Sequence, residues 1–131
     1  MDIVLMDYDR ALRALRDDDC NAALRFCQQF AEKAFKHIIS ANPEQLAEDR
    51  LLLTTHSLVR LARRAEEILG CAYTREDYVH FRQLQSFYFD LNYPGERYED
   101  MGRDETEPVL LWMKGFRAKL EAEAFWHFAS Q

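Results

Sequence analysis

The apolar residues between positions 20 and 41 recur every three or four positions, a spacing that predicts one long amphipathic helix. Ala23, Cys27, Phe30, Ala34 and Ile38 fall on one face when this segment is helical. Glycine and proline are scarce, with 4 and 3 in 131 residues, so few positions interrupt helices. The sequence therefore predicts an all-α fold, an up-and-down helical bundle of about five helices, with residues 1–131 as a single domain.

Cap and turn residues predict where the helices begin and end. The aspartates at 17–19 suit the cap of the helix at 20–41, and the Asn42-Pro43 pair ends it. Thr55 is the expected N-cap of the next helix, which Gly70 terminates. Thr74 and Asp77 resemble a capping box. The remaining helices are expected over 8–15, from the capping box to Leu91, and from Thr106 to Phe128 with Pro108 in the first turn.

Charge and cysteine content limit the classes of function. The net charge of −6 argues against a sequence-independent grip on duplex nucleic acid, so any contact with phosphate must be local. Cys20, Cys27 and Cys71 are odd in number and form no C-x-x-C pair, which predicts reduced core thiols and a cytoplasmic protein. Neither a signal peptide nor a membrane span is expected, because the first residues carry only a short apolar run.

Metal and cofactor sites find little support in the sequence. The four histidines show no metal-ligand spacing with each other or with the cysteines. The four glycines are isolated, so no phosphate-binding glycine loop is present. We therefore expect neither a metal nor a cofactor.

The aromatic content exceeds what one core stripe per helix requires. Two interpretations stay open: the extra rings form a dimer face, or they complete a large monomeric core. The residues concerned are Phe87, Phe89, Trp112, Phe125 and Trp126.

Three segments occur in an order that resembles a known family. They are C-Q-Q-F-A-E-K-A-F-K at 27–36, T-H-S-L at 55–58 and N-Y-P-G at 92–95. Together they resemble the HEPN (higher eukaryote and prokaryote nucleotide-binding) family, and the resemblance covers roughly residues 8–125. It implies a helical bundle that usually forms a homodimer, with a groove near the dimer interface that holds nucleotide or RNA. Many relatives act with a minimal nucleotidyltransferase as a toxin–antitoxin pair.

A subset of the family consists of metal-independent ribonucleases that use an R-x(4-6)-H motif at the start of the final core helix. Arg50 with His56, and Arg75 with His80, match this bare spacing, but chance alone predicts about one such match. Both pairs lie upstream of the turn where the family places its catalytic pair, and residues 92–98 contain no histidine. We therefore expect no independent catalysis.

The residues that we expect to bind nucleotide or RNA phosphate carry positive charge or an aromatic ring. His56 follows the expected helix cap, where the positive helix end favours an anion. Arg97 would replace the arginine that relatives place before Tyr-Pro, where this chain has Asn92. Two interpretations stay open for Lys33, Lys36 and His37: a small cationic patch, or a solvated helix face paired with Glu32 and nearby acids. Arg60, Arg63 and Arg64 are expected to be ordinary surface, because Glu67 is placed to pair with Arg63 and Arg64. The predicted binding residues are Lys33, Lys36, His56, Tyr93 and Arg97.

Three functions remain open from the sequence. The first is nucleotide or RNA binding without catalysis, in a homodimer that acts with a nucleotidyltransferase. The second is a ribonuclease toxin that uses one of the two Arg/His pairs. The third is a protein-interaction scaffold whose basic residues are incidental.

Overall fold

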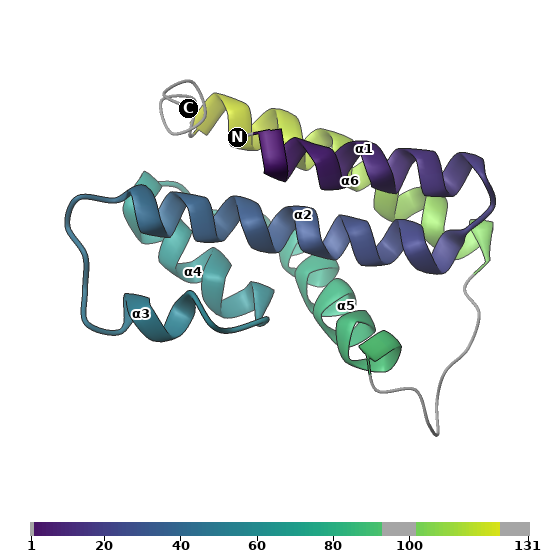
Figure 1. The fold of residues 1–131 in the computed structure, drawn as a ribbon. Helices are drawn as coiled ribbons and strands as arrows, with labels where there is room; N and C mark the ends of the chain where they lie inside the picture. Colours follow the sequence, from purple (N-terminus) through teal and green to yellow (C-terminus); the bar gives the residue numbers. More distant parts are fainter. Residues whose placement is uncertain (1, 93–101, 124–131) are drawn as a thin grey trace.

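The computed structural model describes residues 2–92 and 102–123, and within these ranges the chain forms six helices and no strand (Figure 1). Five helices are long, and the sixth, α3, is a single turn. The predicted all-α bundle of about five helices is therefore confirmed. The helices are α1 (Asp2–Arg16), α2 (Cys20–Ala41), α3 (Asp49–Leu52), α4 (Leu58–Leu69), α5 (Arg75–Asn92) and α6 (Arg103–Glu123).

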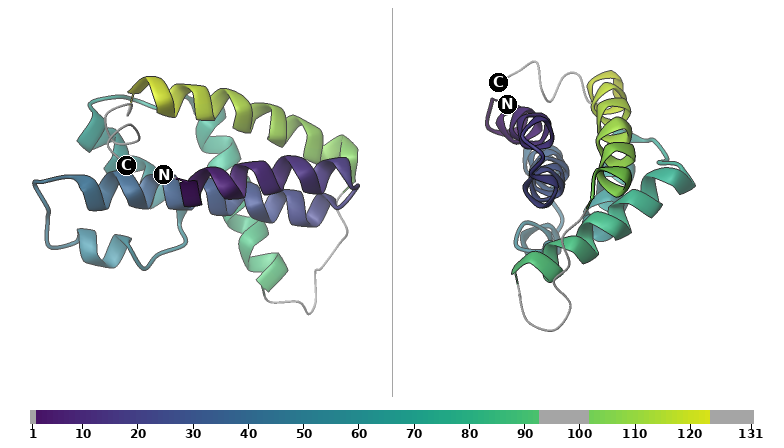
Figure 2. Two further views of the ribbon diagram at one scale, coloured as in Figure 1. Left: turned by 45° about the horizontal axis from the view of Figure 1, so that its top comes forward. Right: turned by 90° about the vertical axis from the view of Figure 1, so that its right-hand side faces the viewer.

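Helix α2 lies at the centre of the bundle and contacts every other helix. It forms a hairpin with α1, and α6 runs along the same side of the molecule as α1 (Figures 1 and 2). Helix α4 lies beside the C-terminal half of α2, whereas α5 crosses α2 obliquely (Figure 1). This arrangement follows from the broad apolar face of α2, which needs partners on several sides.

The core is dominated by aromatic rings that meet edge to face. Phe35 is fully buried, and its ring centroid lies 5.4 Å from that of Phe81 and 5.7 Å from that of Phe116. Tyr73, from the segment between α4 and α5, packs against all three rings at 5.7–5.9 Å. These contacts join α2, α5 and α6, so the aromatic cluster fixes how three helices sit together. Of the five aromatic residues that could form either a dimer face or part of the core, Trp112 belongs to this core. The side chains of the other four, Phe87, Phe89, Phe125 and Trp126, lie outside the described part of the structure.

Three of the predicted caps are confirmed. Asp19 is the N-cap of α2, and its side chain accepts a hydrogen bond of 3.2 Å from the Ala22 amide. Asp77 Oδ2 accepts from the Thr74 amide and Thr74 Oγ1 accepts from the Asp77 amide, both at 3.0 Å, as a capping box requires. Gly70 ends α4 with a positive φ of 67°, a conformation that glycine adopts without strain.

Three predicted helix starts are wrong. Helix α1 begins at Asp2 rather than Tyr8, because Val4 continues the buried stripe of Tyr8 and Ala11 at intervals of four and three. Helix α4 begins after Ser57, whose hydroxyl accepts from the Arg60 amide at 3.4 Å, while Thr55 Oγ1 accepts from the Ser57 amide at 3.2 Å in a tight turn.

The third corrected start is that of α6, which begins at Arg103 rather than near Thr106. Thr106 is buried, and its hydroxyl donates to the Gly102 carbonyl at 2.8 Å. Pro108 is consequently the sixth residue of the helix, beyond the first turn. It removes the hydrogen bond to the carbonyl four residues earlier, and that carbonyl belongs to the exposed Asp104, where water can replace the lost donor. The expected end at Phe128 lies outside the described residues.

The cysteines are unpaired thiols, as predicted, but only two of them lie in the core. Cys20 and Cys27 are buried, and Cys71 is partly exposed after the end of α4. Burial raises the pKa of Cys27 well above its ordinary value. Burial, with the carboxylate of Glu123, raises the pKa of Cys71 to about 11, so this thiol is protonated at neutral pH. No helix in the described part of the chain is long and apolar enough to span a membrane.

Candidate nucleotide-binding site

Glu32 on α2 is the centre of a polar cluster that joins α2 to the start of α4. Its Oε2 atom lies 2.9 Å from Lys36 Nζ, and its Oε1 atom accepts from Gln28 Nε2 at 2.8 Å. Gln28, Glu32 and Lys36 share one face because they are four residues apart on a helix. His56 Nδ1 lies 3.0 Å from Glu32 Oε1, across 24 residues of sequence. We call these four residues the Glu32 cluster.

The carboxylate of Glu32 stays ionised in this environment. Burial alone would raise its pKa, but the hydrogen bonds from Lys36, His56 and Gln28 outweigh that effect and hold the pKa below its ordinary value. The cluster therefore contains one fixed negative charge beside the lysine and the histidine. An anion that binds here must compete with Glu32 for both groups.

The start of α4 is held in place by α5. Ser57 Oγ donates to Gln85 Oε1 at 3.0 Å, and the Val59 amide donates to the same oxygen at 3.3 Å. Gln85 thereby satisfies one of the first amides of α4, which otherwise lack partners. His56 immediately precedes this cap, so it lies at the positive end of the α4 dipole.

Lys33 lies outside the Glu32 cluster, on the side of α2 that faces α1. Its Nζ atom forms an ion pair of 2.6 Å with Oδ2 of Asp7, whose side chain is fully buried. Arg10 Nη1 approaches the other carboxylate oxygen at 3.4 Å. A buried carboxylate needs such compensation, so the charge of Lys33 serves the α1–α2 contact, although 41% of its side chain remains exposed.

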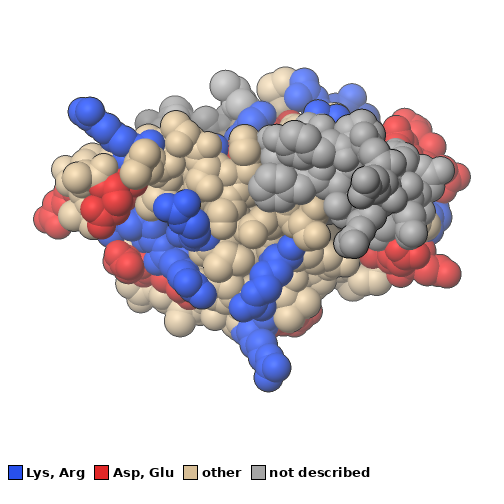
Figure 3. All heavy atoms as spheres, turned by 90° about the horizontal axis from the view of Figure 1, so that it is seen from below, with Lys and Arg blue, Asp and Glu red and all other residues tan. Residues whose placement is uncertain are grey.

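The structure therefore brings together only part of the predicted site. Lys36 and His56 meet at Glu32, and Lys33 is one turn away on a different face. Tyr93 and Arg97 lie outside the described residues. Figure 3 shows separate groups of basic and acidic side chains rather than one continuous basic face, on the part of this surface that is described. This pattern agrees with the expectation that contact with phosphate is local.

The Arg75/His80 spacing does not form one site. Arg75 lines a cavity between α4 and α5 together with Arg82, whereas His80 lines a different cavity beside Trp112 and Lys119. The His80 ring stacks on Trp112 with centroids 4.7 Å apart, and its Nδ1 atom is buried without a hydrogen-bond partner among the described residues. A ribonuclease motif needs the arginine and the histidine to face one substrate, and these two side chains face different cavities. Arg50 is exposed on α3.

Sequence reasoning missed the second role of Asp77. This residue caps α5, but it is also buried and accepts hydrogen bonds from Trp112 Nε1 at 2.9 Å and Lys119 Nζ at 2.7 Å. Burial would raise the pKa of Asp77, and the bonds from Lys119, Trp112 and Thr74 outweigh it, so the pKa lies below its ordinary value. No local pattern links these residues, because 35 and 42 positions separate them.

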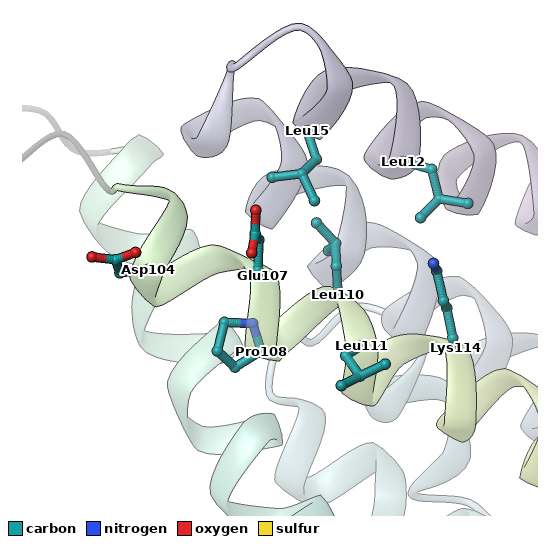
Figure 4. Close-up of a pocket in the computed structure, with 8 residues that line it drawn as sticks. All are labelled: Leu12, Leu15, Asp104, Glu107, Pro108, Leu110, Leu111 and Lys114. Atoms are coloured by element: carbon teal, nitrogen blue, oxygen red, sulfur yellow. The ribbon is translucent and has the colours of Figure 1, made fainter.

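The surface cavities differ in the charge of their lining residues. A groove of about 560 Å³ between α1 and α6 is lined by leucines, two carboxylates and one lysine (Figure 4). Leu12 and Leu15 of α1 face Leu110 of α6 there, while Leu111 is 71% exposed. Asp104 and Glu107 outnumber Lys114, so this groove is unsuited to phosphate. Among the described residues, no group of three His, Cys, Asp or Glu side chains is arranged to hold a metal ion.

The described residues thus form an all-α bundle with a polar cluster between α2 and the start of α4. The family model for the HEPN domain matches residues 5–123, and the chain belongs to this family. Membership confirms the resemblance drawn from the three sequence segments and relates the chain, in general terms, to nucleotide and RNA functions. No curated protein and no solved structure matches the chain significantly.

Proposed function

We propose that this HEPN protein binds the phosphate of a nucleotide or of RNA at the Glu32 cluster, through Lys36 and His56. The observation that carries the proposal is the convergence of these two side chains from different helices on one carboxylate. The positive end of α4 adds to the attraction for an anion at His56. Tyr93 and Arg97 would complete the site from the segment after α5, and Lys33 would contribute at its margin.

The wider proposal concerns assembly. We infer a single domain over residues 1–131 that forms a homodimer and acts with a minimal nucleotidyltransferase in a toxin–antitoxin module. The exposed Leu111 in the groove between α1 and α6 supports an apolar contact between copies. The absence of histidine from residues 92–98 supports a role without independent catalysis.

A metal-independent ribonuclease is the second candidate, and one contact favours it. The Glu32 carboxylate lies 3.0 Å from His56 Nδ1, an arrangement that orients a histidine for proton transfer. RNA cleavage that persists with chelator and disappears in His56→Ala would support this function. Equal cleavage by the wild-type protein and by His56→Ala would come from a contaminating ribonuclease.

Replacing both Lys36 and His56 with alanine is expected to weaken binding of ATP or a short single-stranded RNA by about tenfold or more, because two donors to the anion are removed. Fluorescence anisotropy with labelled ligands measures the change. Lys114→Ala is the matched control, since it removes a lysine exposed on α6 and should leave affinity unchanged.

Glu32→Gln tests the sign of the charge effect in the same assay. The amide keeps hydrogen-bonding capacity but removes the competing carboxylate, so affinity should rise about fivefold. Equal affinity in wild type, Glu32→Gln and the double variant would contradict the proposed site. Absence of any binding by the wild-type protein would favour the scaffold function instead.

A further inference from the structure

The cavity between α4 and α5, which Arg75 and Arg82 line, contains a third arginine. Its volume is about 530 Å³, and its lining residues are Arg63, Glu66, Tyr73, Arg75, Tyr78 and Arg82. Arg75, Tyr78 and Arg82 share one face of α5 because they are three and four residues apart. Arg63 reaches the cavity from α4. We call this the arginine cavity.

The three arginines have no carboxylate partner among the described residues, and all three are exposed. The guanidinium of Arg82 lies over the ring of Tyr78, at 6.0 Å from its centroid. The sequence predicted Glu67 as a partner for both Arg63 and Arg64. Glu67 pairs with Arg64, which also binds the buried Asp49, and no ion pair with Arg63 forms among the described residues. The cavity therefore gathers three arginines without an ion pair in a chain whose net charge is negative.

Glu66 is the acid that lines the cavity, and its two oxygens are already engaged. Oε2 accepts from the Tyr73 amide and Oε1 from the Tyr78 hydroxyl, both at 2.7 Å. Glu66 forms no ion pair with Arg63, Arg75 or Arg82 among the described residues. Three positive charges and one negative charge therefore surround a space of ligand size.

We propose that the arginine cavity binds a phosphate group, supplied by a nucleotide or by an RNA strand. Guanidinium groups donate paired hydrogen bonds that match phosphate oxygens, and a bound phosphate relieves the repulsion between three like charges. The guanidinium of Arg82 lies over one face of the Tyr78 ring, so that face is not open to a base. This site adds to the proposed function and does not require the Glu32 cluster.

The test replaces Arg63 and Arg82 with glutamine, singly and together, in the full chain. Arg60→Gln is the matched control, because Arg60 is an exposed arginine of the same helix as Arg63 and does not line the cavity. Circular dichroism and thermal melting check that each variant folds. Binding is measured with inorganic pyrophosphate, ATP and a short single-stranded RNA.

Each single cavity variant is expected to weaken binding of the probe by about tenfold, the double variant further, and Arg60→Gln by less than about twofold. Tight binding of pyrophosphate and ATP alone would identify a nucleotide as the source of phosphate. Preference for RNA, with the salt dependence reduced by about 0.7 per arginine removed, would identify a strand.

Two results would overturn the inference. One is equal weakening by Arg60→Gln and Arg63→Gln, which would mean a diffuse charge effect. The other is unchanged binding in the Arg63/Arg82 double variant. If Lys36/His56 replacement alone abolishes binding, the Glu32 cluster stands and the arginine cavity fails. If only the arginine variants lose binding, the arginine cavity stands and the Glu32 cluster fails.

Discussion

Replacing Phe35 with alanine is expected to lower the free energy of unfolding by about 3–5 kcal/mol. The ring is fully buried and touches Tyr73, Phe81 and Phe116, so truncation leaves a cavity where α2, α5 and α6 meet. Because domains of this size are stable by only about 5–15 kcal/mol, this loss is a large share of the total. Urea denaturation followed by circular dichroism measures it.

Phe26→Ala is the matched control for this prediction. Phe26 is also on α2, but it is only partly buried at the edge of the core, so its loss should cost clearly less. Phe35→Leu keeps most of the volume and provides a folded variant if Phe35→Ala does not fold. Equal destabilisation by the alanine variants at 35 and 26 would contradict the central place of Phe35.

Asp77→Asn is expected to lower the free energy of unfolding by about 2–3 kcal/mol at neutral pH. Oδ2 of Asp77 accepts from both Lys119 and the Thr74 amide, and Oδ1 accepts from Trp112. An amide has one oxygen and one NH₂ group, so in either orientation a donor faces a donor. The substitution therefore loses the ion pair and leaves at least one buried group without a partner.

This prediction has a pH dependence whose sign follows from the lowered pKa of Asp77. A carboxylate whose pKa is lower in the folded state stabilises the protein above its unfolded pKa, near 3.9, and that contribution is lost as the pH falls through the folded value. The difference between wild type and Asp77→Asn should thus be largest at neutral pH and shrink below about pH 4. Asp9→Asn, at an exposed position on α1, should show neither effect.

The fold was predictable where local patterns determine it. Helix α2 has the predicted bounds, because its apolar spacing and its caps agree with each other. The Thr74/Asp77 capping box is equally local. The start of α4 was misplaced because Thr55 and Ser57 are both acceptable caps, and the choice depends on Gln85 from another helix.

The candidate site was predictable only in part, because pairing between side chains depends on how the helices pack. The sequence left open whether Lys33 and Lys36 form a cationic patch or pair with acids. In the structure Lys36 pairs with Glu32, and Lys33 pairs with the buried Asp7 of α1. The contact of His56 with Glu32 has no signature in local spacing. The arginine cavity was missed for the same reason, since Glu67 was expected to pair with both Arg63 and Arg64, and it pairs with Arg64.

The most direct test of the proposed phosphate site is an NMR titration of the wild-type protein with ATP and, separately, with a short RNA. If phosphate binds at the Glu32 cluster, the ring signals of His56 and the side-chain signals of Lys36 shift together, along one binding curve. The ring signals of His80, which lies in another cavity, should stay in place. Shifts at His80 or elsewhere, with the signals of His56 and Lys36 unmoved, would contradict phosphate binding at the Glu32 cluster.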